Sequence, residues 1–199
     1  HDLGRPGYYH LGIPSGGAMD RYALTCANLL VGNPEGAACL EAVFMGPELE
    51  IRADVTMAVT GAHMTPLVDG VEQPLWTTFD AKKGQILTFD YLKAGARAYI
   101  AFQGGVDVPL YLGSRSTYVI GALGGVDGKP VAAGDELAVG EVSSRTPDGR
   151  TVPDALRRLP GSPAEIRVIP GLYNLRITRE SADRFYAETW PVAPEADRM

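Results

Sequence analysis

The clearest candidate for chemistry is the stretch from Gly12 to Asp20, whose sequence is Gly-Ile-Pro-Ser-Gly-Gly-Ala-Met-Asp. It is a flexible polar turn that leads directly into a helical pattern of apolar residues. Backbone N–H groups at such a helix start are available to bind an oxyanion or a carboxylate. A simpler interpretation is that Asp20 or Ser15 only caps the helix. The two interpretations are compatible.

The common generic catalytic patterns do not occur in the sequence. It contains no G-x-S-x-G, no P-loop, no H-E-x-x-H and no G-x-G-x-x-G that opens a helix after a strand. Cys26 and Cys39 lack a metal-ligand spacing, so we predict two buried thiols and no metal site. His63 carries a side chain suited to proton transfer, but we interpret this lone imidazole as a structural residue.

The elements that must position these residues can be predicted from apolar spacing. A three-and-four spacing predicts one helix from Met19 to Val31, which Gly32-Asn33-Pro34 ends. After the helix the apolar period changes to two, and turn residues recur between the apolar runs. Many short strands of this kind indicate a barrel or a sandwich. We predict strands at residues 40–44, 49–51, 55–59, 67–68, 86–91 and 98–102.

The second half of the chain is organised differently. Residues 103–134 are rich in glycine, and we expect a loop there that covers or lines a site. We predict a barrel domain over residues 1–142, a linker-like segment over 143–163, and a truncated second subdomain, part of another barrel-like domain, over 164–199. Within that subdomain we expect a strand at 165–169 and a short helix at 181–189.

Composition excludes several classes of function. The 199 residues carry a formal net charge of −6, whereas a surface for nucleic acid or an anionic membrane needs clustered Lys and Arg. No apolar run approaches the roughly 20 residues of a membrane helix, and we expect no signal peptide. We therefore predict a cytoplasmic protein that binds small molecules and protein partners. The chain begins at His1 without a Met, which is typical of a fragment.

Blocks of residues also follow one another in an order and spacing that belong to one family. They include Gly4-Arg5-Pro6-Gly7, Gly12-Ile13-Pro14, Ala18-Met19-Asp20, Ala27-Asn28-Leu29-Leu30, Thr60-Gly61-Ala62, Leu112-Gly113-Ser114-Arg115-Ser116-Thr117-Tyr118 and Leu123-Gly124-Gly125. With these blocks the sequence resembles the allophanate hydrolase subunit 2 family over nearly its whole length. Two positions depart from the family pattern: the hydroxyl of Ser15 comes one residue early, and Lys129 replaces an Arg.

The resemblance implies a fold and a class of partner. Members resemble the carboxyl-transferase part of urea carboxylase and the C-type subunit of the bacterial ATP-dependent 5-oxoprolinase. Their fold is a cyclophilin-like β-barrel, which here would be mainly β with one short helix after the glycine-rich turn. Members work beside a companion subunit of the allophanate hydrolase subunit 1 type, and some also with a biotin carboxylase, a biotin carrier or a lactam-kinase subunit. Biotin and ATP would come from such partners, and this chain would bind no cofactor itself.

The implied reaction makes demands on the site. An amide nitrogen is a poor nucleophile, so moving a carboxyl group onto it from carboxybiotin needs oriented partners, a stabilised oxyanion and a base for the amide proton. Asp20 and Glu41 are the candidates for that base or for the acceptor of the substrate amide. Arg5 could pair with a carboxylate in fork geometry. The candidate substrate-binding residues are Arg5, Ser15, Gly16, Met19, Asn28, Ser116, Tyr118, Gly124 and Gly125.

Three hypotheses about function follow. We favour a subunit of an ATP-dependent enzyme that processes a small amide or lactam, of the 5-oxoprolinase, urea carboxylase or allophanate hydrolase type. The alternative is a regulatory protein that binds a companion subunit and modulates a kinase. A third hypothesis is a scaffold for the companion, in which Arg5, Asp20 and Glu41 would tolerate alanine. A fold alone does not decide between them, because one barrel can host many activities.

Overall fold

The two longest strands, β3 (Val55–His63) and β8 (Ala94–Phe102), pair antiparallel at the centre of the fold. Successive side chains of a strand point to opposite faces. Met57 and Ile100 therefore join one buried apolar cluster, whereas Tyr99 joins another on the opposite face. Burial on both faces explains why these strands are almost continuously apolar in sequence.

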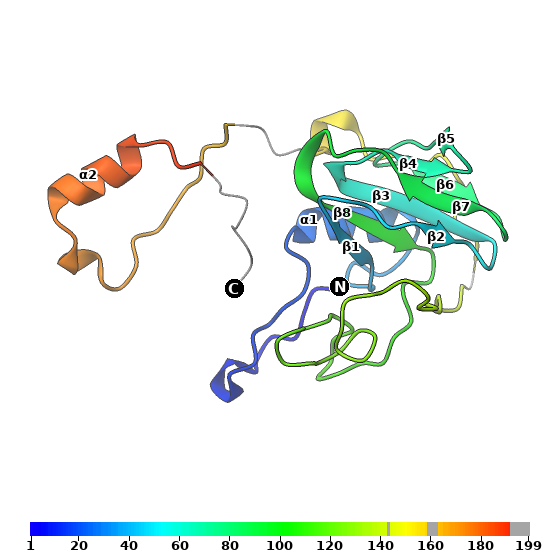
Figure 1. Cartoon of the computed structure of the whole chain (residues 1–199), viewed down its shortest axis with the longest axis horizontal. Helices are drawn as coiled ribbons and strands as arrows, with labels where there is room; N and C mark the ends of the chain where they lie inside the picture. Colours follow the sequence, from blue (N-terminus) through cyan, green and yellow to red (C-terminus); the bar gives the residue numbers. More distant parts are fainter. Residues whose placement is uncertain (143, 159–162, 192–199) are drawn as a thin grey trace. The chain divides into compact units, whose positions relative to one another are not determined.

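The structure is a computed structural model that describes residues 1–142, 144–158 and 163–191. The chain divides into two units, His1–Ser162 and Pro163–Met199. In the described part of the first unit, eight strands form two four-stranded antiparallel sheets, in the orders β1-β8-β3-β6 and β2-β7-β4-β5 (Figure 1). The other strands are β1 (Leu40–Val43), β2 (Leu49–Glu50), β4 (Pro66–Val68), β5 (Val71–Glu72), β6 (Thr78–Ala81) and β7 (Ile86–Phe89).

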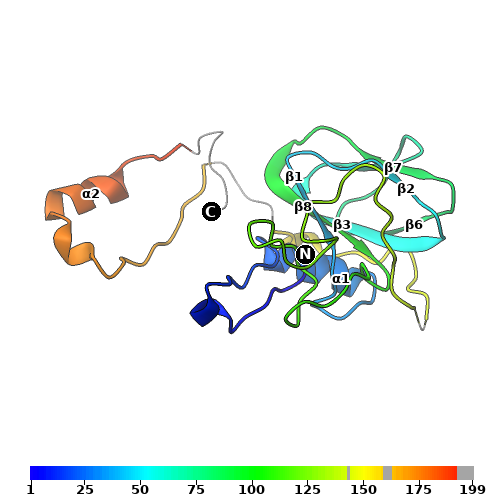
Figure 2. The same ribbon diagram turned by 60° about the horizontal axis from the view of Figure 1, so that its bottom comes forward.

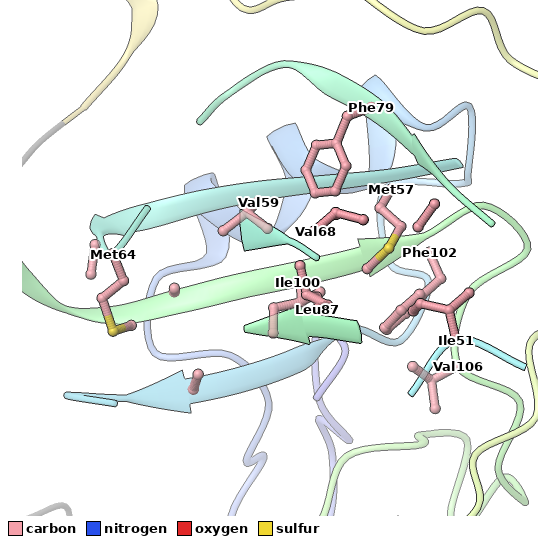
Figure 3. Close-up of a cluster of buried hydrophobic side chains, with 14 of the residues drawn as sticks. Ile51, Met57, Val59, Met64, Val68, Phe79, Leu87, Ile100, Phe102 and Val106 are labelled. Atoms are coloured by element: carbon pink, nitrogen blue, oxygen red, sulfur yellow. The ribbon is translucent and has the colours of Figure 1, made fainter. Parts of the chain in front are cut away.

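The first unit is built in three layers. Between the two sheets lies the larger apolar cluster, in which Val68 and Leu87 of one sheet meet Met57 and Ile100 of the other (Figure 3). Helix α1 (Arg21–Leu30) covers the opposite face of the β1-β8-β3-β6 sheet (Figure 2). Each layer thus removes apolar surface from water, which is the main favourable term in folding.

The predicted fold class is confirmed. The chain is mainly β, and one helix follows the N-terminal glycine-rich turn. The six predicted strands all occur, while β5 and β6 were not predicted. Over the described residues the strands form two sheets and not a single closed ring. The glycine-rich loop expected at 103–134 contains only isolated bridges, such as the one between Tyr118 and Leu123.

Of the segment expected as a linker, 143–163, residues 144–158 are bound to the rest of the first unit. The Thr146 hydroxyl donates to the Val31 carbonyl at 2.9 Å, and the Val152 N–H donates to the Trp76 carbonyl at 2.9 Å. A 3-10 helix, η2 (Asp154–Leu156), follows. Residues 143 and 159–162 lie outside the described residues.

The second unit contains helical structure over its described residues, 163–191. A 3-10 helix, η3 (Asn174–Arg176), precedes helix α2 (Arg179–Ala187), which confirms the helix predicted at 181–189. The strand predicted at 165–169 is wrong, since these residues form no β-ladder. An alternating pattern produces a strand only where a partner strand is available to receive its backbone hydrogen bonds.

Asn28 on α1 holds together the turn that leads from the helix to β1. Its side chain is fully buried, and its amide nitrogen donates to the carbonyls of Glu35 and Ala37 at 3.3 and 2.8 Å. Its amide oxygen accepts from Asn33 at 3.1 Å and from the Cys39 thiol at 3.4 Å. Asn28, predicted as a substrate-binding residue, therefore has its polar atoms engaged inside the fold.

We predict that Asn28→Ala lowers the free energy of unfolding by about 2–3 kcal/mol, because it leaves several buried polar groups without partners. Denaturant unfolding measures the loss. Leu29→Ala is the control, since Leu29 lies on the same helix and is 46% exposed. A wild-type midpoint for Asn28→Ala would show that this network does not stabilise the fold.

Candidate functional site

The buried guanidinium of Arg5 is the centre of the first cluster of predicted site residues. Arg5 is 1% exposed, and among the described residues no carboxylate forms an ion pair with it. Its Nη2 donates to the Ser116 carbonyl, and its Nε donates to the Tyr111 carbonyl at 3.4 Å. Nη1 has no hydrogen-bond partner in the described structure. A buried guanidinium with an unused donor is costly, and an anionic or carbonyl oxygen at Nη1 would offset that cost.

Two glycines border this guanidinium. A Cβ atom on Gly124 would lie 2.7 Å from Nη2 of Arg5, closer than a carbon can approach. A Cβ on Gly16 would lie 3.5 Å from Nη1, with no other atom within 4 Å. Gly16 and Gly124 have φ angles of 58° and 69°, which favour glycine. Because Gly16 has no side chain, only its backbone lies next to Nη1 on that side.

Asp2 joins the N-terminal segment to the glycine-rich loop next to Arg5. Its carboxylate accepts hydrogen bonds from the hydroxyls of Ser114 and Ser116 at 2.7 and 2.6 Å, and from the Arg115 N–H at 2.6 Å. Burial by itself raises the pKa of Asp2, but the hydrogen bonds from Ser116, Ser114, Arg115 and Gly4 outweigh it and hold the pKa below its usual value. Asp2 therefore stays ionised and fixes the loop that contacts Arg5.

A second cluster forms where the turn at residues 15–20 meets the β1-β8-β3-β6 sheet. The Glu41 carboxylate accepts hydrogen bonds from the Tyr99 hydroxyl at 2.8 Å and from the Met19 N–H at 3.1 Å. Arg97 forms an ion pair with Glu41 at 3.4 Å, and the Glu41 side chain is 4% exposed. The Tyr99 hydroxyl in turn accepts from the Asp20 N–H at 2.7 Å. These contacts hold the backbone of Met19 and Asp20 in place.

Charge and burial set the protonation of this second cluster. Burial, together with the nearby Glu41 carboxylate, raises the pKa of Tyr99 well above its usual range. Tyr99 therefore keeps its proton and donates a hydrogen bond to Glu41. The Asp20 carboxylate caps α1, accepting from the Ala23 N–H at 3.0 Å, as the simpler interpretation of the turn expected. No other hydrogen bond joins this carboxylate to a described residue.

The structure brings most of the predicted site residues into two groups. Arg5, Gly16, Ser116 and Gly124 meet around the guanidinium. Met19, Asp20 and Glu41 meet around Tyr99. Ser15 borders the first group through its backbone, because its carbonyl accepts from the Arg5 N–H at 2.6 Å, while its hydroxyl is 3.2 Å from that of Tyr9. The other predicted residues lie outside both groups: Tyr118 bridges to Leu123, Gly125 lies beside Thr117, and Asn28 is buried on α1.

Sequence reasoning missed Asp2, Tyr99 and Arg97. Asp2 contacts Ser116, which is 114 positions away, and Tyr99 contacts Glu41, which is 58 positions away, so no local spacing indicates either pair. A weak signal existed for Tyr99 and Arg97, since both carry polar groups in a strand whose other residues are Ala, Gly, Ile and Phe. Among described residues, no group of three His, Cys, Asp or Glu side chains could hold a metal ion. No helix in that part of the chain is long and apolar enough to cross a membrane.

Comparison with known proteins places this geometry in context. Residues 11–199 match the family described as carboxyltransferase domain, subdomain A and B. The chain is 34% identical to the C-type subunit of 5-oxoprolinase from Escherichia coli, over 100% of this chain and 62% of that protein. It is 38% identical to the urea amidolyase of Saccharomyces cerevisiae over 67% of this chain and 7% of that protein. The urea carboxylase structure of Kluyveromyces lactis superposes with a TM-score of 0.72 at 35% identity, over 78% of this chain and 14% of that one.

We predict that Asp2→Asn lowers the free energy of unfolding by about 2–3 kcal/mol at neutral pH, because an amide cannot accept all the bonds that the carboxylate accepts. Since the folded pKa of Asp2 is lowered from 3.8, its contribution is present above that value and is lost as the pH falls through the folded pKa. The difference between wild type and variant should therefore shrink below about pH 4. Urea unfolding at pH values above and below about 4 measures this difference, and Asp148→Asn, at an exposed residue, is the control. A difference that does not change with pH would contradict the lowered pKa of Asp2.

Proposed function

Because the chain belongs to the family of carboxyltransferase domains, subdomains A and B, we propose that it is a subunit of an ATP-dependent enzyme that processes an amide or a lactam. It is related to the C-type subunit of 5-oxoprolinase and to urea carboxylase, as the sequence resemblance predicted. The chain spans 62% of the Escherichia coli protein and a smaller share of the larger relatives. The activity of the complete protein is therefore part of the proposal.

The observation that carries this proposal is the unpartnered Nη1 of Arg5. Transfer of a carboxyl group to an amide nitrogen develops negative charge on oxygen, and a preorganised cation in a water-poor site stabilises such charge strongly. Arg5 is held in advance by Ser116 and Tyr111, so it would not need to reorganise during reaction. A ligand carboxylate or ureido oxygen could approach Nη1 along the backbone of Gly16.

Asp20 and Glu41 take different roles in this proposal. Glu41 already accepts from Tyr99 and Met19 and pairs with Arg97, so we assign it the role of a positioning residue for the turn. Among the described residues, the Asp20 carboxylate accepts one hydrogen bond, from the Ala23 N–H of the helix that it caps. A carboxylate has about four lone-pair positions, so Asp20 can still accept an N–H of the substrate amide. Asp20 is our candidate for the group that takes the amide proton.

Cofactors and partners belong to the same proposal. ATP, and biotin on a carrier where it is used, would be supplied by partner subunits of the biotin carboxylase or lactam-kinase type. A companion of the allophanate hydrolase subunit 1 type would complete the assembly, which we propose to be cytoplasmic. The relatives compared above are named as enzymes or enzyme subunits, which favours this hypothesis over a kinase regulator or a scaffold.

The assembly is tested by purifying the full-length protein with its partners from its own cells and measuring ATP hydrolysis with urea and with 5-oxoproline. Urea-dependent turnover with a biotinylated partner would identify a carboxylase, and 5-oxoproline-dependent turnover without biotin an oxoprolinase. If a kinase copurifies and no amide stimulates ATP hydrolysis, the regulatory hypothesis replaces the proposal.

We predict that Arg5→Lys lowers the kcat/KM of the reconstituted enzyme by about 10- to 100-fold, because Lys keeps the charge but cannot reproduce the planar fork. Arg52→Lys is the matched control, since its side chain is 62% exposed, and it should keep wild-type activity. Circular dichroism and unfolding midpoints establish that both variants fold. Full activity of a folded Arg5→Lys variant would remove Arg5 from the site while leaving the family assignment intact.

A further inference from the structure

A cavity of about 390 Å³, open to solvent on one side, lies in the first unit beside the end of β3. This volume falls within the range of small-molecule sites. Pro74, Leu75 and Trp76 provide apolar surface, and His63, Thr77 and Arg157 are among its polar lining residues. The cavity shares no lining residue with the two clusters around Arg5 and Tyr99.

Trp76 has two unusual properties at this cavity. Its φ angle is 58°, a conformation that is strained for a bulky residue. Hydrogen bonds hold it there, because its N–H donates to the Val59 carbonyl at 2.8 Å and its carbonyl accepts from the Val152 N–H at 2.9 Å. The side chain is buried, yet its indole Nε1–H has no partner among the described residues. A buried indole N–H usually finds an acceptor.

The polar lining of the cavity favours ligands that accept hydrogen bonds. The protein carries 24 acidic and 18 basic residues, but no described lining residue is acidic. Arg157 is fixed by Nε, which donates to the Val152 carbonyl at 2.9 Å, and by Nη2, which donates to Thr151 at 3.0 Å. Its Nη1 pairs with Asp154, whose side chain is 90% exposed. Such an exposed pair contributes little and can exchange for a better-shielded carboxylate.

We propose that this cavity is a binding site for a small carboxylate with a flat or cyclic apolar body. The carboxylate pairs with the guanidinium of Arg157, and the apolar body lies against Leu75 and the part of Trp76 that lines the cavity. This site is separate from the one proposed around Arg5. It does not rest on the proposed enzyme activity, and its test measures binding alone.

The test is a titration of the full-length ¹⁵N-labelled protein with cyclohexanecarboxylate, which has no aromatic ring to disturb the spectrum, and with the neutral cyclohexanecarboxamide. The tryptophans of this chain are Trp76 and Trp190, and the indole peak that is lost in Trp76→Phe identifies Trp76 directly. We expect the carboxylate to move the Trp76 indole peak in a saturable manner and the carboxamide to bind at least about tenfold more weakly.

Variants of adjacent arginines then test the contact. Arg157→Gln should weaken carboxylate binding at least about tenfold, whereas Arg158→Gln should leave it unchanged, because Arg158 stacks on Tyr22 and does not line the cavity. An unmoved Trp76 peak, equal binding of acid and amide, or equal effects of the two variants would each overturn the proposal. Should Arg157→Gln fail to fold, the comparison of acid with amide on the wild-type protein decides.

Discussion

The antiparallel pair β3 and β8 has to bury apolar side chains on both faces, and the other elements of the first unit follow from that requirement. The second sheet covers one face and α1 covers the other, where Thr60 donates to the Ala23 carbonyl at 2.7 Å. Placing the helix there brings the turn before it against Glu41 and Tyr99. The catalytic geometry proposed for that turn is thus a consequence of how the central strands are covered.

The Arg5 side of the site is assembled differently, from segments without regular secondary structure. Glu41 is positioned by the pairing of β1 with β8. The segments around Arg5 have no such pairing, and the hydrogen bonds to Asp2 hold them instead. Burial of an ionised carboxylate and a guanidinium that do not pair with each other is unfavourable for stability. Unfavourable local arrangements of this kind are typical of functional sites, where the stability of the rest of the fold compensates for them.

Apolar periodicity predicted the helix, six strands and the mainly β class, because two-sided burial leaves a strong signal in strands such as β3. It did not predict β5, which has two residues, or β6, whose Thr-Phe-Asp-Ala sequence is too short to show a period. Periodicity also predicted a strand at 165–169, where no partner strand exists among the described residues. In the site, Asp20 could be predicted as a cap from local sequence, and Arg5 from the family resemblance. Asp2 and Tyr99 could not, since their partners are distant in sequence.

The binding of residues 144–158 to the first unit has an evolutionary consequence. The relatives include a separate subunit and a large polypeptide of which this chain matches 7%. Gene fusion or recombination that separates the first unit has to leave Thr146, Val152 and Arg157 attached to it, because Thr146 bonds to Val31, Val152 bonds to Trp76, and Arg157 bonds to Val152. A breakpoint at residue 142 would leave the backbone of Trp76 and Thr78 without the hydrogen bonds that Val152 and Arg150 make to them. Breakpoints that preserve the first unit therefore lie beyond residue 158.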